Sequence, residues 1–174
     1  MHTIRTLGHG TLSAEEFVNL VRIAEVAVVV DVRRFPGSRR NPQFESDAMA
    51  RWLSERGIGY QWLASLGGRR RPAPDSQNVG LRNEQFRAYA DYMASAEFAV
   101  GVDDLSVLAE ARAVAIMCAE SLWWRCHRRL IADHLVLVSN VHVEHLFHDG
   151  RVVEHTPTAE ARRIDGHVVY GIIR

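Results

Sequence analysis

The clearest strand signal in the chain is the run Ala27-Val28-Val29-Val30-Asp31-Val32, in which β-branched residues follow one another without alternating polar positions. An unbroken apolar run of this kind is typical of a strand that is buried on both faces, as in the parallel sheets of α/β proteins. A second buried run covers residues 113–118. Both runs therefore predict strands of a sheet that is covered by helices on each face.

Shorter strand and helix signals alternate around these two runs. Ser13 and Glu16 form a capping-box signal at the start of one helix, and Gly57 is a typical stop for another. Because strands and helices alternate, we expect a three-layer α/β/α domain with a mainly parallel sheet. The expected strands cover residues 3–7, 27–32, 59–62 and 113–118, and the expected helices cover residues 13–23, 46–56, 83–95, 103–110 and 123–138.

The C-terminal part has a hairpin signal. Asp149-Gly150 stands between two alternating segments at residues 141–147 and 151–154, which predicts an antiparallel β-hairpin that extends the sheet. After it, Thr156-Pro157 is expected to begin a short helix that ends at Arg163. Residues 167–172 are expected to add a further strand.

The amino-acid composition excludes several classes of function for this protein. The chain has 174 residues, of which 47% are hydrophobic, so residues 1–174 are expected to form a single domain with a substantial core. The 21 basic and 21 acidic residues balance, so binding of a polyanion would depend on local clusters of charge. All 21 basic residues are arginines, and the lack of lysine excludes Schiff-base chemistry and P-loop nucleotide binding.

The sequence has no signal for a membrane or for secretion. The longest apolar run, around residues 26–30, is far shorter than the roughly 20 residues that span a bilayer. The N-terminus leads into a strand pattern and not into a signal peptide, so we expect a cytoplasmic protein without membrane contact. Cys118 and Cys126 are the two cysteines, and we expect no disulfide between them in a reducing compartment.

Polar residues stand at the carboxyl ends of three expected strands. Gly8-His9-Gly10 follows the first strand, Asp31 and Arg33 end the second, and Cys118-Ala119-Glu120 ends another. In open α/β sheets, ligands bind outside the carboxyl ends of the strands. These residues are therefore expected to meet at one edge of the sheet and to form a site there.

The expected helix at residues 123–138 brings a histidine and several arginines to this edge. Its helical wheel places His127 near the centre of the apolar face, one turn into the helix and pointing inward. Arg125, Arg128 and Arg129 lie in its first turns, where exposed backbone N–H groups also favour an anion.

Together, these motifs resemble those of the DUF488 domain family, and the resemblance covers nearly the whole chain. It implies an α/β fold and a shared site, whereas the reaction has to be inferred from the residues themselves. The motifs that carry the resemblance are Thr6-Leu7-Gly8-His9-Gly10, Asp31-Val32-Arg33-Arg34-Phe35-Pro36-Gly37-Ser38 with Phe44, Tyr60 before Leu66-Gly67-Gly68, and Cys118-Ala119-Glu120 with Cys126-His127-Arg128.

Two loops are rich in arginine, one from Arg33 to Pro42 and the other from Leu66 to Gly80. They are either solvated charged loops or phosphate-binding sites, because guanidinium groups form paired hydrogen bonds with phosphate. Asp31 and Arg33 likewise form either a structural ion pair or an anion-binding arginine that a carboxylate holds in position. The aromatic residues interleaved with the loops, which are candidates for stacking on a base, are Phe35, Phe44, Tyr60 and Trp62.

Cys118, Cys126 and His127 allow three interpretations. A zinc site is disfavoured by the seven-residue gap between the cysteines and by the lack of a second cysteine pair, so we expect no metal. A buried cysteine at the end of an apolar strand is most simply a small core residue. A thiolate near a helix N-terminus and a histidine would instead be activated for nucleophilic attack.

Glu120 is the strongest candidate for acid–base chemistry. At a strand end beside His127 and His9, its carboxylate is expected to act as a general base on water or to stabilise developing positive charge. The alternatives for Glu120 are a helix N-cap or an ion pair with Arg128.

These features favour a hydrolase that acts on nucleic acid or a nucleotide, such as a DNA-repair N-glycosylase that takes a base out of the stack into a small pocket. No cofactor is expected. The expected catalytic residues are Glu120, His127, Asp31 and His9. The expected substrate-binding residues are Arg33, Ser38, Arg39, Phe44, Tyr60, Gly67, Gly68, Arg69, Cys118, Cys126 and Arg128.

Two other functions stay open. One is a cysteine-dependent, rhodanese-like enzyme that acts on a small anionic substrate. The other is a non-catalytic nucleic-acid-binding module, for which loss of Arg33 or Arg69 would weaken binding while Glu120→Gln would change nothing. The expected partner is nucleic acid or a phosphate-bearing small molecule, and the expected state is a monomer or a weak homo-oligomer.

Overall fold

The computed structural model describes residues 2–171, and its main feature is a six-stranded sheet. The strands are β1 (Thr3–Gly8), β2 (Val28–Asp31), β3 (Gly59–Trp62), β4 (Val114–Cys118), β5 (His142–Leu146) and β6 (Val152–Glu154). Their order across the sheet is β3-β2-β4-β1-β5-β6, and all neighbours are parallel except the antiparallel pair β5 and β6. The predicted hairpin extension of a mainly parallel sheet is therefore confirmed.

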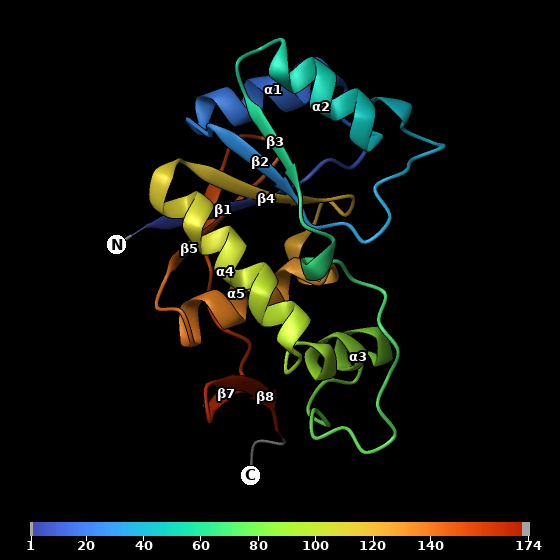
Figure 1. Ribbon diagram of the computed structural model, residues 1–174, viewed down its shortest axis with the longest axis vertical. Coiled ribbons are helices and arrows are strands. Elements are labelled where there is room, and N and C mark those ends of the chain that lie inside the picture. The colour runs from blue at the N-terminus through green and yellow to red at the C-terminus, as the bar shows by residue number, and fades with distance from the viewer. Residues whose placement is uncertain (1, 172–174) are drawn as a thin grey trace.

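Helices cover both faces of this sheet (Figure 1). Helices α1 (Ala14–Ile23) and α2 (Ser46–Ser54) pack on one face, and α3 (Glu84–Tyr92), α4 (Ala96–Ala111) and α5 (Arg128–Leu137) pack on the other. This arrangement confirms the predicted three-layer α/β/α architecture. Within residues 2–171, no helix has both the length and the apolar character needed to cross a membrane. Short 3-10 turns lie at Pro42–Phe44, Ala64–Leu66 and Trp123–Arg125.

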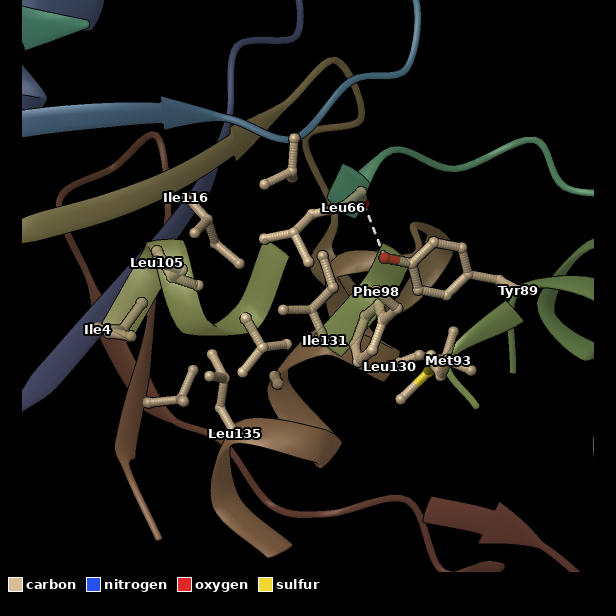
Figure 2. Packing of buried hydrophobic residues seen from close by; sticks show 14 of the residues in the cluster. Ile4, Leu66, Tyr89, Met93, Phe98, Leu105, Ile116, Leu130, Ile131 and Leu135 are labelled. Atoms are coloured by element: carbon tan, nitrogen blue, oxygen red, sulfur yellow. Dashed lines mark hydrogen bonds between the residues drawn. The ribbon is translucent and has the colours of Figure 1, made fainter. Parts of the chain in front are cut away.

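The alternation of side chains along each strand divides the core between the two faces. Val29 of β2 packs with Phe17 and Met49 on the side of α1 and α2, whereas Val28 and Val30 pack on the opposite side. The strand is apolar throughout because helices bury both of its faces. Figure 2 shows part of the core on the side of α3, α4 and α5, where it labels Ile4, Leu66, Tyr89, Met93, Phe98, Leu105, Ile116, Leu130, Ile131 and Leu135.

Two helices begin at other residues than the sequence predicted. Helix α4 begins at Ala96 and not at residue 103, because the Ser95 side chain accepts a hydrogen bond from the backbone N–H of Phe98 and caps an earlier turn. Helix α5 begins at Arg128 and not at residue 123. Cys126 has an extended backbone, with φ −130° and ψ 156°, which separates the preceding 3-10 turn from the helix.

The C-terminal segment also differs from the prediction. Instead of a helix that ends at Arg163, the chain forms a second hairpin from β7 (Ala161–Ile164) and β8 (His167–Tyr170). Asp165 and Gly166 connect these strands with positive φ angles of 49° and 82°, which is the backbone that an Asp-Gly hairpin turn adopts. This hairpin is a separate sheet. The last residue of the expected strand, residue 172, lies outside the described part of the chain.

Candidate active site

The carboxyl ends of β1, β2 and β4 meet at a cavity of about 420 Å³. Strand β4 pairs with both β1 and β2, so the segments that follow these strands lie side by side, as expected for a site in an α/β sheet. The cavity brings together many of the predicted site residues, namely His9, Arg33, Ser38, Gly68, Arg69, Cys118, Glu120, Cys126 and His127.

A second cavity of about 420 Å³ adjoins the first. The two cavities share His9, Ser38 and Glu120 in their walls, and the second is also lined by Arg39. The remaining predicted site residues do not line either cavity, and their contacts explain how the lining residues are held. These residues are Asp31, Phe44, Tyr60, Gly67 and Arg128.

Asp31 is fully buried and holds Arg33 in place. Its carboxylate accepts hydrogen bonds from Nε and Nη2 of Arg33, at 2.9 Å and 2.6 Å, and from the Tyr60 hydroxyl at 2.7 Å. Burial and the charge of Asp31 raise the pKa of Tyr60, so this hydroxyl stays protonated and donates. Nη2 of Arg33 also donates to the Phe44 carbonyl at 2.7 Å. Asp31 does not line the cavity itself. It holds Arg33, which does.

His9 is a neutral histidine in the cavity wall. Its Nδ1 lies 2.9 Å from the carbonyl of Gly10 and therefore carries the ring proton, while Nε2 accepts from Nη1 of Arg33 at 3.4 Å. Burial lowers the pKa of His9 to about 4. The ring stacks on the fully buried Phe44, with ring centroids 4.3 Å apart. Phe44 thus supports His9 from below the cavity.

Two buried thiols lie next to each other in the cavity wall. Cys118 ends β4, Cys126 lies just before α5, and their Sγ atoms are 2.7 Å apart. Burial acts to raise the pKa of Cys126, but the hydrogen bond with Cys118 and the charge of Arg128 outweigh it and lower this pKa to about 6. Burial raises the pKa of Cys118 well above its ordinary value. The pKa values of the two thiols are therefore shifted in opposite directions, and Cys126 is the one that ionises more readily.

Arg128 lies beneath the two thiols and is 1% exposed. Its Nε donates to Cys118 Sγ at 3.0 Å, and Nη1 donates to the Thr6 hydroxyl at 3.1 Å. Nη2 donates to the carbonyl of Glu120 at 2.5 Å. None of these side-chain contacts within residues 2–171 is to a carboxylate. Because an isolated buried charge is strongly unfavourable, the adjacent thiolate is the nearest group that can balance the guanidinium.

His127 directly precedes α5, which corrects the prediction that it lies one turn into the helix. Its Nε2 lies 2.8 Å from the carbonyl of Val32 and therefore carries the ring proton. Nδ1, which then has the lone pair, lies 3.4 Å from Cys126 Sγ. Burial lowers the pKa of His127, so the ring is neutral and its Nδ1 can accept a hydrogen bond from a thiol.

Glu120 is exposed and lines both cavities. Its Oε1 accepts a hydrogen bond from the backbone N–H of Leu122 at 3.3 Å. The contact with Arg128 predicted as an alternative is made by the Glu120 carbonyl and not by its carboxylate. Among the described residues, no hydrogen bond joins Glu120 to His127, so the two groups expected to share acid–base work face the cavity separately.

The loop that precedes α3 closes one side of the cavity through two glycines. A Cβ atom on Gly67 would lie 2.5 Å from Cα of Arg34, and one on Gly68 would lie 3.0 Å from Nδ1 of His127. Nη1 of Arg34 donates to the carbonyl of Arg69 at 2.6 Å and joins the two arginine-rich loops. The glycines are therefore needed for close approach of the loop to the site.

Helix α3 contributes Gln85, Phe86 and Tyr89 to the cavity, and the sequence-based prediction did not include them. The Tyr89 hydroxyl donates to the carbonyl of Leu66 at 2.7 Å, which Figure 2 draws as a dashed line. The Tyr89 ring lies 5.1 Å from the His127 ring, centroid to centroid. Amphipathic spacing could place Tyr89 on a buried face, but no motif connects it to the cysteines.

A buried chain of hydrogen bonds runs from Arg128, the first residue of helix α5, to Asp133 further along the same helix. Thr6 Oγ1 lies 2.8 Å from His145 Nδ1, His145 Nε2 lies 2.9 Å from His155 Nδ1, and His155 Nε2 lies 2.9 Å from Asp133 Oδ1. An arginine only donates and an ionised carboxylate only accepts. Every bond in this chain can therefore point from Arg128 toward Asp133, with both histidines neutral. The sign of this network in the sequence is Asp133, a carboxylate at a buried position of helix α5.

Residues that could hold a metal are not grouped in this part of the molecule. Within residues 2–171, no cluster of three or more His, Cys, Asp or Glu side chains has the arrangement of a metal site. The cavity is instead lined by thiols, arginines, a carboxylate and two neutral histidines.

Comparison with known proteins gives one finding. Among the curated proteins and among the solved structures, nothing matches the chain. A family described as "Domain of unknown function DUF488" matches residues 13–135, which is well over half of the 174 residues. The matched part includes the Asp31–Arg33 pair, both cysteines and Arg128, which form and support much of the cavity wall. The chain therefore belongs to the DUF488 family.

Proposed function

We propose that the protein is a cysteine-dependent transfer enzyme in which the Cys126 thiolate attacks a small anionic substrate bound in the first cavity. The observation that carries this proposal is the thiol pair above Arg128, a buried cation whose side-chain contacts within residues 2–171 include no carboxylate. A low thiol pKa next to a positive charge and a helix N-terminus is the usual property of a nucleophilic cysteine.

The cavity wall supports an anionic substrate. Arg33, Arg34, Arg69 and Arg125 line it, together with a single carboxylate from Glu120. Asp31 balances the charge of Arg33, which leaves an excess of positive charge from the other arginines. Because guanidinium groups bind oxyanions through paired hydrogen bonds, they would hold the substrate beside Cys126.

The attack needs no change in the proton content of the resting site. The Cys126 sulfur forms a bond to an electrophilic atom of the substrate, and the bond from that atom to its leaving group breaks, with the electron pair going to the leaving group. Cys118 or another acid then supplies a proton to the leaving group. When the Cys126 thiol is protonated, Nδ1 of His127 can take up that proton, because it has a lone pair and lies 3.4 Å from Cys126 Sγ.

Iodoacetate and iodoacetamide test this proposal, because they have similar size and differ in charge. We expect iodoacetate to alkylate Cys126 in the folded protein, with a preference over iodoacetamide that exceeds the preference of the unfolded chain. Arg125→Ala should lower this preference about fivefold, as expected for loss of one nearby charge. Arg163→Ala, an exposed arginine of β7 outside the cavity, is the matched control and should leave it unchanged.

The same experiment can overturn the proposal. Peptide mapping that finds no modification of Cys126 in the folded chain, or an unchanged preference in Arg125→Ala, would contradict an anion-binding thiol site. Cys126→Ser should abolish the alkylation that the arginines accelerate.

A second candidate is the hydrolase of nucleic acid or nucleotides, and the observation that favours it is the position of Glu120. Its exposed carboxylate lies in the wall that both cavities share, and the exposed ring of Phe35 lines the first cavity with Arg34 and Arg69. A base could stack on Phe35 while the arginines hold phosphate. Glu120 would then act as the general base on water.

End-labelled oligonucleotides with modified bases separate the two candidates. The hydrolase predicts cleavage that Glu120→Gln abolishes and Cys126→Ser leaves intact, whereas the thiol enzyme predicts no cleavage at all. Salt-sensitive binding without cleavage, weakened by Arg69→Ala and not by Glu120→Gln, would instead favour a nucleic-acid-binding module.

A further inference from the structure

Cys118 lies close enough to Cys126 for the two thiols to react with each other, which a single nucleophilic cysteine does not need. Cys118 and Cys126 both line the first cavity, and the 2.7 Å between their Sγ atoms leaves no room for another group between them. A disulfide bond is about 2.05 Å long, so a small movement would join the two sulfur atoms. One sulfur belongs to a strand of the central sheet, and the other lies just before a helix.

Arg128 contacts this pair in a way that suits a reaction of both thiols. Its Nε donates to Cys118 Sγ at 3.0 Å, and its backbone N–H donates to Cys126 Sγ at 3.5 Å. One buried cation can therefore balance a negative charge on either sulfur. When Cys126 becomes neutral through a covalent bond, the positive charge of Arg128 favours the thiolate of Cys118.

We propose that Cys118 and Cys126 form a redox-active dithiol that reduces a small anionic disulfide bound in the first cavity. This inference rests on the proposed function, because Cys126 is the attacking thiol in both, and it assigns the substrate class and a second reacting residue, Cys118. The arginines of the cavity wall select the negative charge of the disulfide.

The reaction proceeds in two exchanges of sulfur partners. In the first, the Cys126 thiolate attacks one sulfur of the bound disulfide R–S–S–R, so that a Cys126–S–S–R bond forms and R–S⁻ leaves with the electron pair of the broken bond. In the second, Cys118 loses its proton and attacks the Cys126 sulfur, which forms the Cys118–Cys126 disulfide and releases the second R–S⁻. The proton of Cys118 goes to one of the two leaving thiolates, so the products are R–S⁻ and R–SH.

The electron count of the two exchanges is balanced. The thiol pair loses two electrons, and the substrate disulfide gains them. The enzyme then returns to its starting state when an external thiol reduces the Cys118–Cys126 bond by the same exchange in reverse. The loop that this disulfide would close contains only residues 119–125.

The test uses the full-length reduced protein and two probe disulfides of opposite charge. Glutathione disulfide carries net negative charge, and cystamine carries positive charge. With glutathione disulfide we expect intact mass to fall by two hydrogen atoms, both protein thiols to disappear, and two glutathione thiols to be released per protein. Cystamine should react about tenfold more slowly with the folded chain. The unfolded chain in denaturant is the control and should lose this charge preference.

Two variants identify the role of each cysteine. In Cys118→Ser, the first exchange should still occur and the mass should rise by one glutathionyl group on Cys126, since no second thiol can release it. Cys118→Ala should give the same adduct, which guards against an effect of the serine hydroxyl. Cys126→Ser should react with neither disulfide.

The failure of this inference is distinguishable from the failure of the proposed function. If iodoacetate labels Cys126 but the wild-type protein accumulates a stable glutathione adduct, as Cys118→Ser does, Cys118 is not a resolving thiol and only the dithiol inference is overturned. If the internal disulfide forms equally fast with both probes, Cys118 resolves the adduct but the cavity does not select an anionic disulfide, and the substrate class inferred here is wrong. If Cys126 reacts with no reagent, both proposals are wrong.

Discussion

Arg128 and Cys126 are the two residues on which the proposal of sulfur chemistry depends. A guanidinium that is 1% exposed needs a nearby anion, and the side-chain partners described within residues 2–171 are a thiol, a hydroxyl and backbone carbonyls. The hydrogen bond between the thiols keeps one proton on the pair, so Cys126 supplies the negative charge. The thiolate and the arginine therefore stabilise each other in the folded state.

The pH dependence of Cys126 reactivity follows from this pairing. We expect the alkylation rate and the thiolate ultraviolet absorbance to show a midpoint near the pKa of about 6, whereas an unperturbed cysteine has a pKa of about 8.5. A pKa lowered by folding means that the thiolate stabilises the folded state fully above the unfolded pKa of about 8.5. This stabilisation is then lost as the pH falls through about 6.

The measurement is the rate of reaction with iodoacetate between pH 4 and pH 9, together with urea unfolding at the same pH values. The same chain in denaturant should return to a midpoint of about 8.5. A folded-state midpoint at or above that of the denatured chain would show that Arg128 does not hold Cys126 as a thiolate.

Among the elements, the loop that precedes α3 shows how backbone packing shapes the cavity. Gly67 lies so close to Arg34 that a Cβ atom would be 2.5 Å from the Arg34 Cα. Arg70 strengthens this contact because its Nε donates to the carbonyl of Gly67 at 3.0 Å and its guanidinium lies over the Tyr92 ring. The loop is thus fixed against both the first arginine-rich loop, which contains Arg34, and helix α3.

Gly67→Ala should therefore move the loop and open the cavity. We expect unfolding by urea to show a loss of about 1–3 kcal/mol, as for overpacking of a tight contact, and the preference of Cys126 for iodoacetate to fall with it. Gly37→Ala is the matched control, since Gly37 also lines the cavity but a Cβ there would have no atom within 4 Å. Equal stability of Gly67→Ala and Gly37→Ala would contradict this account of the loop.

Across the domain, the hydrogen-bonded chain from Arg128 to Asp133 joins the site to the C-terminal hairpin. Thr6 lies on β1 and His145 on β5, while Asp133 lies on α5. Asp133 also accepts from the Tyr170 hydroxyl at 2.8 Å, and Tyr170 is the last residue of β8. Burial lowers the pKa of His145 to about 3, so this histidine stays neutral and passes a hydrogen bond in one direction. The core network and the candidate site thus depend on the same buried arginine.

Removal of Asp133 should destabilise the domain strongly. Asp133→Ala leaves the His155 ring, the Tyr170 hydroxyl and the backbone N–H of Thr158 without their acceptor. We expect a loss of about 3–5 kcal/mol in urea unfolding, because three buried donors lose a charged acceptor. Asp104→Ala, at an exposed position of α4, should change stability by less than about 0.5 kcal/mol.

A small effect of Asp133→Ala, similar to that of Asp104→Ala, would show that the network contributes little to the free energy of unfolding. Asp133→Asn gives a second comparison, because it keeps the shape of the side chain and removes its charge.

Local patterns in the sequence were sufficient to predict the architecture. Apolar runs at β2 and β4, the capping box at Ser13 and the Asp149-Gly150 turn depend on residues that are neighbours in the chain, so each is readable without a structure. The strand-end rule then located the edge at which the cavity lies. The C-terminal segment shows a failure of the same method, because Thr156-Pro157 suited a helix start and the turn at Asp165-Gly166 was not identified as a hairpin signal.

Contacts between distant parts of the chain decided the chemistry of the site. His127 binds the carbonyl of Val32, and Arg128 connects through Thr6 to His145, so the partners of each group come from elements far apart in the sequence. The pKa of a thiol depends on burial and on neighbouring charges, and neither is visible in the spacing of Cys118 and Cys126. Sequence pattern thus specified which residues reach the edge of the sheet, whereas folding determined which of them touch and which carry charge, because electrostatic interactions depend on distance in space and not along the chain.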